Sequence, residues 1–181
     1  SHTAAIAGSE RAYEAGLRKA GAIRLDSTEA LFAAGAMLIG GSIPDSEGVA
    51  VITNAGGPGV IATDAIGDST AELASFSAET RERLSRVLPE TANVHNPVDV
   101  IGDAPAERFG DALEVVLSDP AVGSAVVIAC PSAVLSFEEL AGTLSTFRRK
   151  KETPFAVCLM GGSSVEGPTE TLAETETPTY F

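Results

Sequence analysis

The stretch with the strongest chemical signature is the loop Asn54-Ala55-Gly56-Gly57-Pro58-Gly59. Glycines allow backbone amides to turn outward and let a bulky anion approach the main chain closely. Pro58 suits the first turn of a helix, where its missing N–H removes no helical hydrogen bond. The start of a helix also carries unpaired N–H groups and a partial positive charge. The loop therefore indicates a cradle for a phosphate or another anion.

The same loop partly satisfies a dinucleotide-binding motif. Gly57-x-Gly59-x-x-Ala62 matches its relaxed glycine pattern. The motif also needs an acidic residue about twenty positions further on, at the end of the second strand. Glu79 has that spacing, but we expect it to begin a helix. No Gly-Lys-Ser/Thr follows the loop, so the Walker pattern is missing. A dinucleotide-binding domain and a plain strand-to-helix turn without ligand therefore remain alternatives.

Composition narrows the class of protein. The 181 residues amount to one domain, or one domain and part of another, and 44% of them are apolar, enough for a core. The formal net charge of −13 argues against a nucleic acid or an anionic membrane as partner. Cys130 and Cys158 lie in apolar runs without metal-ligand spacing, which is typical of reduced thiols in the cytoplasm. We expect no membrane span and no signal peptide. The chain has no initial Met, so we expect a fragment of a longer protein.

The elements that must position the loop follow a regular alternation after residue 48. β-branched apolar runs predict strands, and stretches with helical periodicity predict helices between them. The predicted strands are 49–53, 72–76, 98–101, 125–130, 155–159 and 177–181. The predicted helices are 58–67, 78–88 (capped by Ser77), 105–117, 137–150 and 165–173.

The first part of the chain is organised differently. We predict a helix from Ser9 to about residue 20, a short strand over 23–25, and a helix over 28–39 capped by Ser27 or Thr28. Residues 40–48 are rich in Gly, Ser and Pro, as in a linker. We place a domain boundary there, which gives domains 1–43 and 44–181.

Five successive strand–helix units indicate the fold class. They predict an α/β fold, a three-layer doubly wound flavodoxin-like parallel sheet with helices on both faces. Ligands of such sheets bind outside the carboxyl ends of the strands. Four predicted loops meet at that edge, namely 54–59, 101–105, 131–136 and 161–164.

Three segments together carry a family resemblance. Thr53–Val60, Asn96–Asp103 and Met160–Gly162 resemble the NDP-forming acyl-CoA synthetases (ADP-forming acetyl-CoA synthetase), which belong to the succinyl-CoA synthetase superfamily. Ser1-His2-Thr3 resembles that family's segment around a histidine that is phosphorylated during turnover. The resemblance implies that 1–43 is the last part of one flavodoxin-like domain. It implies that 44–181 is a flavodoxin-like CoA-ligase domain.

The resemblance also implies a reaction. A carboxylic acid, CoA and ATP give a CoA thioester, ADP and phosphate through an acyl phosphate and a phosphohistidine. His2 would be that histidine, and Gly56, Gly57 and Gly59 would bind phosphate. Asn54 is a further candidate for phosphate binding, and it is also interpreted as the residue that pins the glycine loop. The family further implies a small acid substrate, an oligomer, and CoA, ATP or ADP and Mg²⁺ in the full-length enzyme. It implies CoA-binding and ATP-grasp domains or subunits outside this chain, so we expect the isolated fragment to be inactive, without a cofactor or metal of its own.

The remaining candidates are weaker. Asp99 is interpreted as a structural carboxylate that supports the site, and His95 as a surface histidine. Ser132, Ser163 and Ser164 could donate to phosphate or cap helices, and capping is the commoner use.

Two departures from the family pattern are noted: Ala4 replaces a usual Gly, and Pro131-Ser132 replaces a frequent Pro-Gln. Relatives of this architecture that are fused to a protein acetyltransferase suggest the alternative function, an acyl-CoA-sensing regulatory domain.

Overall fold

A computed structural model describes the chain except for residues 1–9, 41–43, 45 and 151–152. It divides into two compact units, Ser1–Gly35 and Ala36–Phe181. The division lies within helix α2, before the predicted linker, part of which falls outside the described residues. No helix among the described residues combines the length and apolar character needed to cross a bilayer.

Two helices dominate the N-terminal part, α1 (Glu10–Lys19) and α2 (Thr28–Gly40). Ser27 caps α2 as expected, because its Oγ accepts the Ala30 N–H at 3.0 Å. The strand predicted over 23–25 is wrong: these residues form neither helix nor strand. A strand needs a partner for its backbone groups, and no described segment pairs with these residues.

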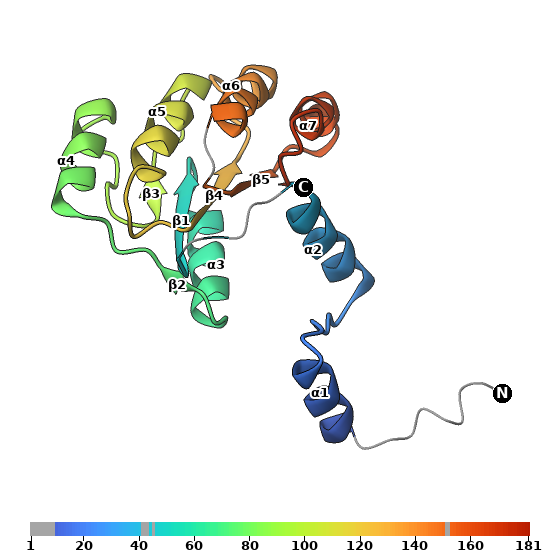
Figure 1. Cartoon of the computed structure of the whole chain (residues 1–181). Helices are drawn as coiled ribbons and strands as arrows, with labels where there is room; N and C mark the ends of the chain where they lie inside the picture. Colours follow the sequence, from blue (N-terminus) through green and yellow to red (C-terminus); the bar gives the residue numbers. More distant parts are fainter. Residues whose placement is uncertain (1–9, 41–43, 45, 151–152) are drawn as a thin grey trace. The chain divides into compact units, whose positions relative to one another are not determined.

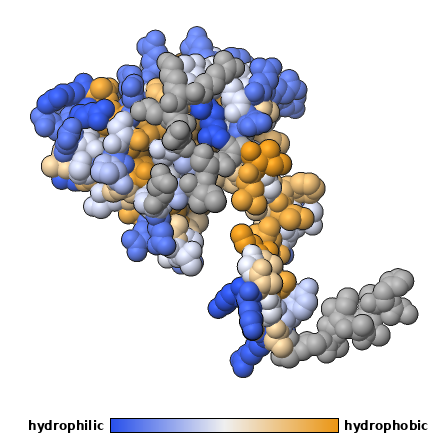
Figure 2. Space-filling model, in the orientation of Figure 1, coloured by the Kyte–Doolittle hydropathy of each residue, from blue (hydrophilic) through white to orange (hydrophobic). Residues whose placement is uncertain are grey.

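Helix α2 presents aliphatic and aromatic side chains to its surroundings. Phe32, Leu38 and Ile39 are each more than 70% exposed. Figure 2 shows that the surface over α2 is mostly hydrophobic. A helix that is apolar nearly all round is typical of the interior of a larger core.

The second unit is built on a six-stranded sheet in the order β2-β1-β4-β5-β6, with β3 also pairing with β1. Every strand pair is parallel (Figure 1). The strands are β1 (Gly48–Thr53), β2 (Glu72–Leu73), β3 (Val98–Asp99), β4 (Ser124–Ala129), β5 (Phe155–Leu159) and β6 (Thr179–Tyr180). The helices are α3 (Gly56–Gly67), α4 (Ala78–Val87), α5 (Ala106–Val116), α6 (Phe137–Lys150) and α7 (Glu166–Ala173), the last preceded by the 3₁₀ turn η1 (Gly162–Val165).

Helices cover both faces of this sheet, which confirms the doubly wound class. Figure 1 shows α4, α5, α6 and α7 in a row on one face and α3 on the other. Alternate strand residues such as Ile52 and Val127 join Leu84, Phe109 and Leu140 in one core. Burial of this core fixes the register of the strands, since a slip by one residue would turn each apolar side chain outward.

Several element boundaries differ from the predictions. Helix α3 begins at Gly56 rather than residue 58, and β2, β3 and β6 are two residues each. The short strands pair over few positions: β3 meets β1 only at Ile52↔Val98 and Thr53↔Asp99. The hydrophobic pattern indicates where the chain is extended. The length of a hydrogen-bonded strand depends on its neighbouring strands, which the local sequence does not identify.

Candidate functional site

The glycine loop joins the buried end of β1 to α3. Thr53 is fully buried, and its Oγ1 accepts the Ala55 N–H at 3.1 Å. Ala55 is the N-cap residue, with φ −145° and ψ 124°, and no side chain caps the helix there. Gly56 and Gly57 are exposed, and a methyl group added at either would have no other atom within 4 Å. The first N–H groups of α3 therefore lie at an open surface.

The start of α3 also differs from the other helix starts in charge. Of the seven α-helices in the described part of the chain, α3 alone has no acidic residue in its first turn. The first-turn acidic residues elsewhere are Glu10, Glu29, Glu79, Glu107, Glu138, Glu139 and Glu166. A carboxylate there stabilises the positive end of the helix dipole. Helix α3 has neither that carboxylate nor a side-chain cap, so an external anion would meet no competing charge in its first turn.

The third glycine of the loop has another use. Gly59 is buried, and a Cβ at this position would lie 3.0 Å from Thr53 Cγ2 and 3.9 Å from Pro97. Its missing side chain lets α3 pack directly on β1. The structure thus assigns close packing to Gly59 and leaves Gly56 and Gly57 for exposure of the main chain.

Asn54 ties the loop to the neighbouring strand. Its Oδ1 accepts the Cys130 N–H at 2.8 Å, and its Nδ2 donates to the Cys130 carbonyl at 2.9 Å. The residue is only 5% exposed. Asn54 therefore connects the carboxyl ends of β1 and β4 rather than facing solvent.

The loop after β3 forms the other side of this edge. Asp99 Oδ1 accepts the Ile101 N–H at 2.9 Å, as expected of a structural carboxylate. Ile101 has φ 70°, a strained conformation for a β-branched residue. Arg108 Nη1 holds the loop by donating to the Val100 carbonyl at 3.0 Å and to Asp103 Oδ1 at 2.6 Å. Strain of this kind persists where surrounding bonds over-determine the backbone.

Family models match both parts of the chain. Residues 49–181 match the Ligase-CoA domain, and residues 1–38 match the succinyl-CoA ligase like flavodoxin domain. The chain belongs to the Ligase-CoA domain family. The resemblance of its motifs to NDP-forming acyl-CoA synthetases is thereby confirmed.

Individual relatives agree with this assignment. The chain is 36% identical over its whole length to an ADP-forming acetate–CoA ligase I of Archaeoglobus fulgidus, of which it covers 25%. It is 34% identical over 99% of its length to an ADP-forming 4-hydroxybutyrate–CoA ligase of Nitrosopumilus maritimus, of which it covers 26%. It also matches, with a TM-score of 0.91 and 28% identity, a dinucleotide forming acetyl-coenzyme A synthetase 1 of Ca. Korarchaeum cryptofilum solved with phosphate and ADP. That match covers 99% of this chain and 39% of the solved chain. The chain thus spans about a quarter of the length of these two ligases.

Ser132 and Ser164, two of the serines that the sequence offers as phosphate donors or caps, bond to backbone groups close to them in the chain. Ser132 Oγ accepts the N–H groups of Val134 and Leu135 at 3.3 and 3.1 Å. Ser164 Oγ donates to the Gly161 carbonyl at 2.7 Å. Burial raises the pKa of the Cys130 thiol, which lies 3.7 Å from the Met160 sulfur. The side-chain oxygens of Ser132 and Ser164 are thus bonded to backbone groups of the loops after β4 and β5.

The chain contains two histidines, His2 and His95. His2 lies outside the described residues, so its role stays a prediction. His95 is exposed in the loop before β3, beside a surface hollow of about 260 Å³ also lined by Arg81 and Asn96. Asn96 binds the carbonyl of Val49, near the start of β1, so His95 lies toward the amino ends of the strands.

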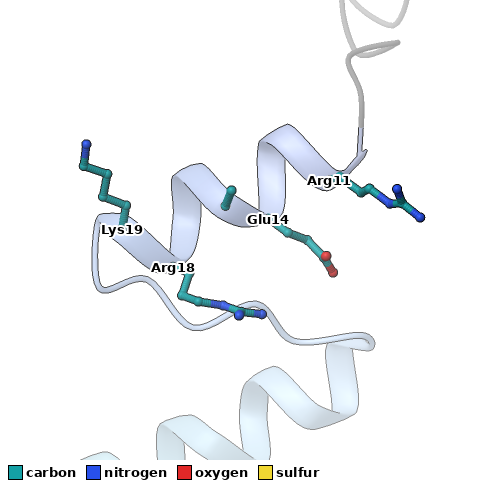
Figure 3. Close-up of a pocket in the computed structure, with 5 residues that line it drawn as sticks. Arg11, Glu14, Arg18 and Lys19 are labelled. Atoms are coloured by element: carbon teal, nitrogen blue, oxygen red, sulfur yellow. The ribbon is translucent and has the colours of Figure 1, made fainter.

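The described residues offer no converging cationic site along α1 and no metal site. A surface hollow of about 460 Å³ lies along one side of α1 and is lined by Arg11, Glu14, Ala15, Arg18 and Lys19. Figure 3 shows Lys19 directed away from Arg18, so these cations do not converge. No group of three or more His, Cys, Asp or Glu side chains in the described residues could hold a metal ion, and we assign no Mg²⁺ site to them.

Some contacts and one backbone conformation in the site could not be predicted from the sequence. The hydrogen-bond partner of Asn54 could not be identified, because Cys130 is 76 residues away in the chain. Gly102 signals a turn after β3, but nothing local indicates that Ile101 adopts the positive φ. Arg108 could have been suspected only from its spacing to Asp103.

Proposed function

We propose that this chain is part of an ADP-forming acid–CoA ligase and that the start of α3 holds the phosphoryl group during its transfer. The observation that carries the proposal is the exposed, uncapped first turn of α3, free of acidic residues, in a member of the Ligase-CoA domain family. The names of the related ligases support the reaction class. The relative from Ca. Korarchaeum cryptofilum was solved with phosphate and ADP, which are both products of the proposed reaction.

The proposed reaction has three steps: phosphorylation of His2, formation of an acyl phosphate and formation of the CoA thioester. A neutral imidazole nitrogen of His2 takes the γ-phosphoryl group of ATP and ADP leaves. A carboxylate oxygen of the acid then attacks this phosphorus, which gives an acyl phosphate and restores His2. The thiol of CoA loses its proton, which passes to the phosphate or to solvent, and its sulfur attacks the acyl carbon. The bond between the acyl carbon and the bridging oxygen breaks, so that the thioester forms and inorganic phosphate leaves with that oxygen.

The described residues contribute electrostatic stabilisation. Backbone N–H groups at the start of α3 point outward, where negative charge on the phosphoryl oxygens would be stabilised. Exposed Gly56 and Gly57 present no side chain to the anion, and Asp99 and Arg108 fix the neighbouring loop. A local site of this kind is needed because the chain as a whole, with a net charge of −13, repels anions.

The rest of the enzyme lies beyond this chain in the proposal. The chain spans about a quarter of two related ligases, so we assign nucleotide and CoA binding to ATP-grasp and CoA-binding domains or subunits elsewhere. Mg²⁺ would act with the nucleotide there. We further propose a small carboxylic acid as substrate, an oligomeric assembly and a cytoplasmic location.

The experiment is phosphoryl labelling of the full-length protein with γ-³²P-ATP. We expect acid-labile, base-stable label that is lost in His2→Ala. His95→Ala is the matched control, because it removes the chain's other histidine, and it should retain the label. Label that persists in His2→Ala would contradict the assignment of the histidine. Absence of label with retained acyl-CoA binding would favour a regulatory domain instead.

A further inference from the structure

We propose that Asn54 is a positioning residue for phosphoryl transfer: it fixes the start of α3 against β4 and does not itself bind the phosphoryl group. This inference rests on the proposed function. Of the two roles that the sequence suggests for this asparagine, phosphate contact and pinning of the glycine loop, the inference selects the second and names Cys130 as its partner.

The hydrogen bonds of Asn54 support this assignment. Its two polar side-chain atoms both bond to the backbone of Cys130, at 2.8 and 2.9 Å. With 5% of the residue exposed, little of the amide remains accessible to a ligand. The bonded pair closes a ring between two chain segments, which specifies orientation as well as distance.

The position of Asn54 gives these bonds a functional consequence. The residue directly precedes Ala55, the N-cap of α3. Its neighbour Thr53 accepts the Val100 N–H through its carbonyl at 2.8 Å, which ties the same turn to the loop after β3. The last residues of β1 are therefore held from both sides, by β4 through Asn54 and by the β3 loop through Thr53. Misplacing reacting groups by about 1 Å can cost roughly 10²-fold in rate.

The chain contains a matched control for this residue. Asn96 makes the same kind of bonds: its Nδ2 donates to the carbonyls of Val49 and Ala74 at 2.8 and 3.0 Å, and its Oδ1 accepts the Val51 N–H at 2.9 Å. It acts on the same strand, β1, but at Val49 and Val51, before the residues that lead into α3. Loss of either side chain leaves backbone groups unpaired, so both substitutions should lower the unfolding temperature.

The test compares Asn54→Ala and Asn96→Ala in the full-length protein. Thermal unfolding and the single-turnover rate of His2 labelling from γ-³²P-ATP are measured for each variant, at a temperature where both are folded. We expect both to lose stability, and only Asn54→Ala to lose labelling rate, by roughly 10- to 100-fold. Equal labelling rates in the two variants would overturn the inference. A wild-type protein that takes no label would overturn the proposed function and this inference together, so the two failures are distinct.

A second variant keeps the test decisive if Asn54→Ala does not fold. Asn54→Asp retains an acceptor for the Cys130 N–H, and when protonated it can also donate to the Cys130 carbonyl. Its labelling rate relative to wild type should therefore rise as the pH falls and the buried carboxyl becomes protonated. A ratio that does not change with pH would overturn the positioning role.

Discussion

Ala55→Asp is the substitution that most directly tests the open start of α3. The N-cap backbone, with φ −145° and ψ 124°, already has the extended conformation in which an Asp side chain accepts N–H groups of the first turn. We expect a gain in stability of about 0.5–2 kcal/mol, since a cap is added where none exists. The added carboxylate occupies the donors intended for the phosphoryl group. For two unit charges about 5 Å apart at an effective dielectric constant of about 20, the repulsion is roughly 3 kcal/mol. Phosphoryl transfer should therefore slow by more than about 10²-fold.

The assay for Ala55→Asp pairs urea unfolding with single-turnover labelling of the full-length protein. Ala55→Asn separates the two effects, because it adds a comparable cap without the charge and should slow transfer less. Ser77→Ala is the opposite control: Ser77 Oγ accepts the Thr80 N–H at 3.1 Å as the cap of α4, so its loss should cost about 1 kcal/mol and leave transfer unchanged. A stabilised Ala55→Asp protein with wild-type transfer would refute the proposed role of α3.

Two further predictions concern the packing of the Ligase-CoA domain. Gly59→Ala places a methyl group 3.0 Å from Thr53 Cγ2. Overpacking should cost about 1–3 kcal/mol, whereas the higher helix propensity of Ala should contribute about 1 kcal/mol, so the free energy of unfolding should fall by about 0–2 kcal/mol. Gly67→Ala, at the other end of the same helix and in open space, should instead gain about 0.4–1 kcal/mol, and urea titration of both variants checks the difference in sign. Asp119 is buried; burial raises its pKa, but hydrogen bonds from the Thr80 side chain and from backbone N–H groups outweigh this and lower it. Its contribution is therefore present above its unfolded pKa of about 3.9 and is lost as the pH falls through the lower folded value, so the stability gap between wild type and Asp119→Asn should shrink below about pH 4.

The alternation of strands and helices was predictable because it depends on local pattern. β-branched runs at 49–53, 125–130 and 155–159 gave the three long strands within a residue at each end. The predicted Ser77 cap is confirmed by its bond to the Thr80 N–H. Glu79 stands in the first turn of α4, as predicted, and not at the end of a strand, which removes its role in a dinucleotide motif. These features need only neighbours a few residues away.

The parts that were not predictable depend on distant partners. The strand expected at 23–25 has no ladder to join, whereas β2, β3 and β6 keep only the residues that meet a partner. Asn54 could be placed in the loop from the sequence, but its bonding to Cys130 depends on the order of β1 and β4 in the sheet. The fold class and the loop-pinning role of Asn54 could therefore be predicted from the sequence, whereas the partner of Asn54 and the close packing at Gly59 could not.

The start of α3 joins these observations into one physical argument. Every other α-helix in the described residues has a glutamate in its first turn, and serines cap α2, α4 and α6. Helix α3 forgoes both contributions, yet its strand end is held by Asn54 on one side and by the Val100 N–H on the other. A helix start that is rigidly placed and electrostatically unsatisfied is preorganised for an anion, because binding requires no loss of an internal partner. The start of α3 thus lacks the stabilising cap and carboxylate, and in the proposed function the phosphoryl group supplies the negative charge there.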